Sequence, residues 1–110
     1  MINLNQMAVA EFLKAKKDRL EKIRNFVEIS QEIASDVKDY KDYYVLTSVA
    51  NEAQKEANEI YKEIELVEYV NNAIRTKEAG GFMAQFTELS SENIAKANKL
   101  VANFIAQTEL

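Results

Sequence analysis

Apolar residues recur along two successive stretches of the chain in steps that alternate between four and three residues. Such spacing keeps the apolar side chains on one face of a helix and is typical of coiled-coil seams. The first stretch has this seam: Val9, Leu13, Lys16, Leu20, Ile23, Val27, Ser30, Ala34 and Val37. The second has this one: Leu46, Ala50, Ala53, Ala57, Ile60, Ile64, Val67, Asn71 and Ile74. The sequence therefore predicts two long helices that bury their seams against each other.

The ends of these helices follow from capping residues and helix propensity. Asn3 or Asn5 can cap the first helix, which we expect over residues 5–40. Helix propensity is weakest over residues 39–44, and Asp42 can cap a second helix over 43–79. We therefore expect the chain to reverse near residues 41–45. This reversal places Leu20 opposite Val67 and Lys16 opposite Asn71, so that large residues meet large ones and polar residues share a layer.

A third, shorter helix follows the two glycines of the chain. Gly80 and Gly81 can adopt the positive φ that ends a helix. Residues 82–89 then form a short helical turn, and Ser90 or Ser91 caps a last helix over 91–107. The predicted fold is a single all-α domain over residues 1–110, in which a long antiparallel, coiled-coil-like hairpin carries a third helix, as in a three-helix bundle.

One flank of the first helix is apolar beside the seam. Phe12, Phe26, Ile33 and Tyr40 recur every seventh residue, with Arg19 as the interruption. The matching flank of the second helix has Val49, Glu56, Glu63 and Val70. The last helix is long enough to cover about half of a hairpin of ~50 Å. We expect a partner to cover the rest. The alternative is a three-helix monomer in which the linker before the last helix folds over the remainder.

The leading functional hypothesis is a non-catalytic protein–protein interaction protein, such as an assembly component, adaptor or inhibitor. Its partner is a second copy of itself, in a dimer or higher oligomer, or another protein. Three tyrosines near the expected turn either anchor that partner or cover the end of the core. The proposed contact residues are Phe12, Phe26, Ile33, Tyr40, Tyr43 and Tyr44.

Composition narrows the chemistry. The chain of 110 residues has no Cys and no His, so thiolate and imidazole ligands are absent and we expect no metal site, cofactor or catalytic residue. The apolar runs are far shorter than the ~20 residues of a membrane span. We therefore expect a cytoplasmic protein without a membrane partner, in the host cytoplasm if a phage encodes it. The excess of Lys over Arg weakly favours a bacterial or phage source.

Two alternative functions remain open. Clustered basic residues on the first helix can bind a nucleic acid, although the net charge of −4 and two interrupting acidic residues disfavour this partner. The possible contacts are Lys14, Lys17, Lys22 and Arg24. A small anion could instead bind at a subunit interface, near the polar residues that precede Gly80. These are Asn71, Asn72, Arg75 and Lys77.

Overall fold

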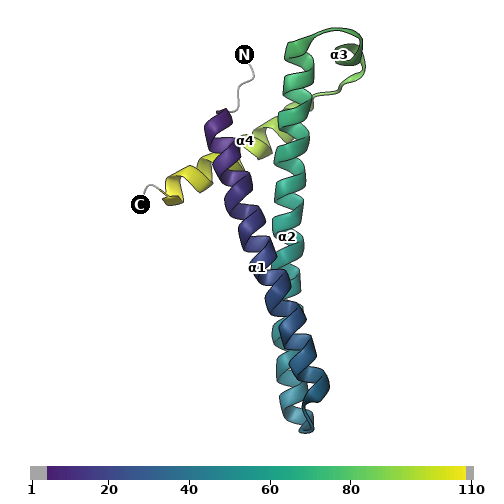
Figure 1. The fold of residues 1–110 in the computed structure, drawn as a ribbon. Coiled ribbons are helices and arrows are strands. Elements are labelled where there is room, and N and C mark those ends of the chain that lie inside the picture. Colours follow the sequence, from purple (N-terminus) through teal and green to yellow (C-terminus); the bar gives the residue numbers. More distant parts are fainter. Residues whose placement is uncertain (1–4, 109–110) are drawn as a thin grey trace. The chain divides into compact units, whose positions relative to one another are not determined.

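The computed structural model describes residues 5–108, and four helices account for most of them. Helix α1 spans Gln6–Asp36, α2 spans Tyr40–Ala79, α3 spans Phe82–Phe86 and α4 spans Ser91–Thr108. Helices α1 and α2 pack against each other in antiparallel directions (Figure 1). Residues 5–108 contain no strand. The predicted fold class, an all-α helical hairpin with a shorter helix packed on it, is confirmed.

Side-chain caps and a glycine fix three of the helix ends. The Asn5 Oδ1 atom accepts hydrogen bonds from the Met7 and Ala8 amides at 3.1 and 3.3 Å, so Asn5 is the N-cap of α1. The alternative cap Asn3 lies outside the described residues. Ser90 Oγ accepts a bond from the Asn93 amide at 3.3 Å and caps α4. After α2, Gly80 has φ +72° and its amide donates to the Lys77 carbonyl, as predicted for a helix C-terminus.

The chain reverses over residues 37–39, earlier than the sequence predicts. Asp39 caps α2, because its Oδ1 atom accepts a hydrogen bond of 2.8 Å from the Lys41 amide. Helix α1 consequently ends at Asp36 instead of near residue 40, and α2 begins at Tyr40 instead of 43. The assignment of the cap to Asp42 was wrong, and Asp42 lies in the first turn of α2.

The described residues divide into two compact units. The first, which we call the α4 unit, consists of residues 5–15 and 63–108. The second, the turn unit, consists of residues 16–62 and contains the chain reversal.

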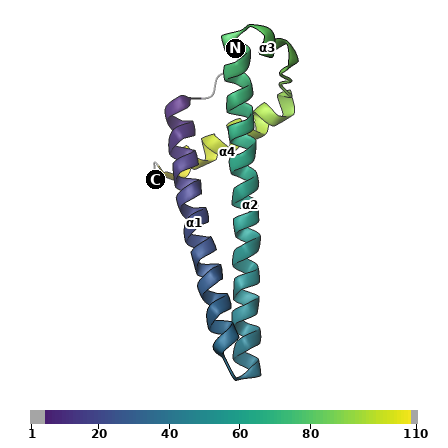
Figure 2. The same cartoon turned by 45° about the vertical axis from the view of Figure 1, so that its right-hand side comes forward.

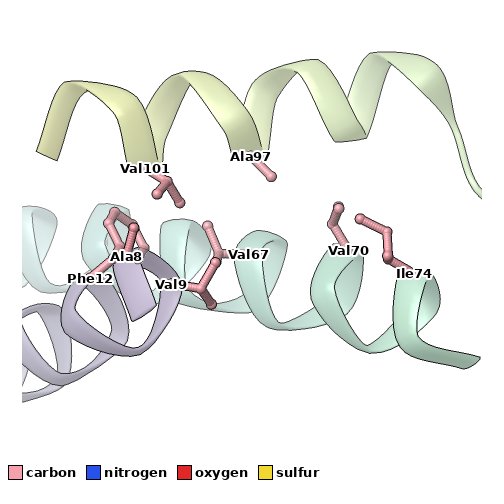
Figure 3. Close-up of a cluster of buried hydrophobic side chains, with 8 residues drawn as sticks. All are labelled: Ala8, Val9, Phe12, Val67, Val70, Ile74, Ala97 and Val101. Atoms are coloured by element: carbon pink, nitrogen blue, oxygen red, sulfur yellow. The ribbon is translucent and has the colours of Figure 1, made fainter. Parts of the chain in front are cut away.

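In the α4 unit, α4 packs across the start of α1 and the end of α2. Figures 1 and 2 both show α4 crossing these helices obliquely instead of running along them. Phe12 is 1% exposed, and its ring meets Phe104 of α4 edge-on with 5.7 Å between the centroids. Figure 3 shows the buried cluster, which consists of Ala8, Val9, Phe12, Val67, Val70, Ile74, Ala97 and Val101.

In the turn unit, the seams of α1 and α2 are buried against each other as predicted. The buried residues from α1 are Leu20, Ile23, Val27, Ser30 and Ala34, and those from α2 are Ala50, Ala57 and Ile60. Small residues dominate on the side of α2, which allows the two helices to approach closely. No third helix belongs to this unit, so the flanks of its single seam remain at the surface.

The pairing between α1 and α2 differs from the predicted register in both units. In the α4 unit, Gln6 Nε2 donates to Asn71 Oδ1 at 2.8 Å, where the prediction placed Lys16 opposite Asn71. In the turn unit, Arg19 bonds Glu56 at 2.9 Å. In both units, the residue that faces a given position of the other helix lies about three helical turns from the one that the predicted register places there. The cause is the earlier reversal, because moving a turn along the chain shifts the facing position by twice as many residues.

Candidate interaction surface

The structure separates the apolar contact residues that the sequence grouped together. Phe12 is buried in the core of the α4 unit, so its assignment to a partner-binding surface was wrong. The reason is α4, which covers this flank and packs Phe104 on the Phe12 ring. Phe26 and Ile33 lie in the turn unit with about half of their surface exposed, at 47% and 49%. These two residues remain available for a partner.

Phe26 and Ile33 belong to a larger apolar surface of the turn unit. We call this surface the apolar face and define it by five residues that are between 43% and 61% exposed, namely Phe26, Ile29, Ile33, Val45 and Val49. Sequence analysis missed Ile29 and Val45. Ile29 lies three residues after Phe26 and Val45 lies four residues before Val49, so helical spacing was the signal that could have found both.

A salt bridge places the two halves of the apolar face on the same side of the turn unit. Arg19 Nη2 and Glu56 Oε1 lie 2.9 Å apart across α1 and α2. Phe26 and Val49 are each one heptad nearer to the turn, so they share this side of the hairpin. A groove of about 290 Å³ adjoins Phe26, and its lining is Arg19, Lys22, Ile23, Phe26, Ala53 and Glu56. The apolar face therefore has a polar, charged border at this end.

The three tyrosines contact one another at the start of α2. The Tyr40 and Tyr44 hydroxyls share a hydrogen bond of 2.9 Å, and their ring centroids are 4.7 Å apart. Tyr43 packs against Tyr44 at 6.0 Å. The bond with Tyr40 raises the pKa of Tyr44, and desolvation and Tyr43 act in the same direction. All three remain exposed, and Tyr44 points about 100° away from Val45 around the helix.

The basic residues of α1 that lie in the turn unit do not share one side of the helix. These residues are Lys17, Lys22 and Arg24, and Lys14 belongs to the α4 unit. The Arg24 guanidinium lies 5.9 Å from the centre of the Tyr61 ring, in a cation–π contact. Lys17 and Arg24 are one heptad apart and share a side of α1, but Lys22 points elsewhere. Among these residues, Lys22 is the one that borders the groove beside the apolar face.

The polar residues proposed for anion binding are not gathered in one pocket. Asn71 is buried and its amide oxygen accepts the bond from Gln6. Asn72 borders a groove of about 420 Å³ in the α4 unit, but neither Arg75 nor Lys77 lines it. Its lining is Tyr69, Asn72, Ala73, Phe86, Thr87 and Glu88. The charged group in this lining is a carboxylate, which disfavours an anion.

Within residues 5–108, no group of three or more acidic, His or Cys side chains is arranged to hold a metal ion. In the same part of the chain, no helix combines the length and the apolar character needed to cross a membrane. The apolar face is the surface of the turn unit on which large apolar side chains from both α1 and α2 gather. No protein-family model matches the chain, and neither the curated proteins nor the solved structures contain a significant match.

Proposed function

We propose that this protein is a non-catalytic interaction protein that binds a helix of a protein partner on the apolar face of the turn unit. The observation that carries the proposal is the half-exposed state of five large apolar side chains on one side of α1 and α2. Assembly component, adaptor and inhibitor are the roles that such binding can serve. The cytoplasmic location and the bacterial or phage source stay predictions.

The α4 unit supports a helix as the binding element. Phe12 and Phe26 occupy the same heptad position on α1, and Val70 and Val49 occupy the same heptad position on α2. In the α4 unit, Phe12 and Val70 are each 1% exposed beneath a helix, α4. Phe26 and Val49 lie at these heptad positions in the turn unit, where they are 47% and 43% exposed and can contact a helix that belongs to another chain.

The arrangement of these residues also indicates a protein-binding site and not a set of isolated exposed apolar side chains. A contiguous apolar surface with a charged border is typical of protein interaction sites, whereas isolated exposed apolar residues are common everywhere. The apolar face is contiguous, because Phe26, Ile29 and Ile33 follow one another along one side of α1. Arg19 and Glu56 supply the charged border.

Site-specific photo-crosslinking in cells that make the protein tests the proposal. A photoreactive amino acid at Ile29 should give a discrete covalent adduct with a protein, because this position lies within the apolar face. The matched control carries the same amino acid at Asn51, an exposed polar position of α2, and should give no adduct. The absence of any adduct at Ile29 would contradict the proposed function.

A charged double variant identifies the surface that makes the contact. Phe26→Glu with Ile33→Glu should remove the Ile29 adduct while the circular dichroism of the helices stays nearly unchanged, since both side chains are already half exposed. The control Gln31→Glu with Gln54→Glu adds the same charge at exposed positions on the opposite flank and should keep the adduct. Unfolding of the first variant would instead assign Phe26 and Ile33 to the core.

A further inference from the structure

We infer that the partner on the apolar face is a second copy of this chain, whose α1 packs antiparallel against α1 of the first. The inference rests on the proposed function and names its partner. Three observations carry it: the spacing of exposed residues on α1, the charges at the two ends of that spacing, and the larger apolar side chains on α1 than on α2.

Helix α1 carries a second stripe besides the buried seam. In the turn unit, five exposed residues follow one another in steps of four and three, namely Lys22, Phe26, Ile29, Ile33 and Asp36. This is the spacing by which a helix meets another helix over several turns. The seam satisfies one such contact with α2, so the second stripe provides for a contact with a further helix.

The charges at the ends of the stripe make it complementary to itself. A cation, Lys22, lies at one end and an anion, Asp36, lies at the other, with three apolar residues between them. In an antiparallel pair, Lys22 of each copy approaches Asp36 of the second copy, whereas a parallel pair would bring like charges together. A twofold axis near Ile29 generates both contacts at once, as in isologous dimers.

The pairing of α1 with α1 also covers the apolar face better than the main alternative. If α1 lay on α2 of the second copy instead, Phe26, Ile29 and Ile33 would meet only Val45 and Val49. With α1 on α1, the three large residues meet three large residues, and the valines of the two copies flank them. The two arrangements predict different neighbours for Ile29, which are Ile29 of the second copy in the first case and α2 in the other.

Sedimentation velocity of the purified chain tests the dimer and its charges together. We expect a reversible dimer for the natural sequence. Lys22→Asp and Asp36→Lys should each weaken dimerisation roughly tenfold, because each replaces two attractions by two repulsions. The double variant Lys22→Asp/Asp36→Lys should recover most of the lost dimer affinity. Lys99→Asp makes the same charge change at an exposed position of α4 and should leave the dimer unchanged.

A single cysteine reports the arrangement directly, because the chain has no cysteine of its own. Ile29→Cys should form a disulfide between two copies under mild oxidation if α1 packs on α1. Asn51→Cys, on the exposed side of α2, is the matched control and should stay reduced. A dimer that forms no disulfide at position 29 and is not restored by the double charge reversal would overturn the α1 pairing.

The outcomes separate this inference from the proposed function. A chain that stays monomeric at every concentration overturns the inference of a second copy. If the photo-crosslinker at Ile29 then gives an adduct with a different protein, the proposed function stands. If it gives none, both fail. An Ile29 adduct of twice the mass of the chain, together with recovery of the dimer in the double variant, supports both.

Discussion

The same heptad positions are buried in the α4 unit and about half exposed in the turn unit. Phe12 and Phe26 lie two heptads apart on the same flank of α1, yet Phe12 is 1% exposed and Phe26 is 47% exposed. Val70 and Val49 repeat the contrast on α2. A heptad position fixes the direction of a side chain relative to the seam, but whether that direction leads to core or to solvent depends on what covers it.

The largest expected effect comes from disrupting the packing of α4 on the buried cluster of the α4 unit. Val101 of α4 is buried against the cluster of the α4 unit, so Val101→Asp places a carboxylate where no partner can satisfy it. We expect the free energy of unfolding to fall by more than about 3 kcal/mol. Urea unfolding followed by circular dichroism measures this loss. Ala102→Asp adds the same charge at the next, exposed position and should cost far less.

Truncation of the two phenylalanines compares the units directly. Phe12→Ala should destabilise the protein by about 3–5 kcal/mol, because it removes a fully buried ring and leaves a cavity beside Phe104. Phe26→Ala should cost about 1 kcal/mol or less when the chain is monomeric, since half of the ring is already in water. Equal losses in urea unfolding at low protein concentration would contradict the assignment of the two flanks.

The next effect concerns the reversal that defines the turn unit. Asp39→Ala removes the side-chain acceptor of the Lys41 amide and should cost about 1 kcal/mol. Asp42→Ala should cost only ~0.3–1 kcal/mol, because Asp42 interacts with the start of α2 through the helix dipole. Thermal unfolding of both variants ranks them, and a greater loss for Asp42→Ala would place the helix start where the sequence alone suggested it.

The smallest effect lies at the border of the apolar face. Arg19 and Glu56 form a salt bridge with about half of each side chain exposed. A double-mutant cycle with Arg19→Ala and Glu56→Ala should therefore give a coupling of only ~0.2–1 kcal/mol. Urea unfolding of the four chains measures it. A coupling of zero would remove this pair as evidence for the register of the turn unit.

Sequence reasoning succeeded where local chemistry decides the outcome. The heptad spacing identified seam residues such as Ile23 and Ile64, which are buried. Asn5 and Ser90 cap their helices, since a short polar side chain before an apolar repeat favours a helix start. Gly80 adopts positive φ at the end of α2 because it has no Cβ.

The register was beyond sequence reasoning because neither proline nor glycine marks the reversal. Asp39 and Asp42 are both competent caps, and the choice of Asp39 moves the turn by a few residues. The seams repeat every heptad, so apolar residues still meet apolar residues after such a shift, and the seam alone does not select one register. The choice between alternative registers depends on the sum of the contacts along both helices.

By itself, the sequence determined the helices, the residues that form their seams and the caps at several of their ends. These features depend on spacing and on bonds within one or two turns, which the order of residues fixes. Only the tertiary structure decided that Phe12 is core and Phe26 is surface. The reason is that, within the α4 unit, α4 crosses the start of α1 and the end of α2 obliquely and covers Phe12. The direction of such a crossing is set by packing between residues far apart in the chain.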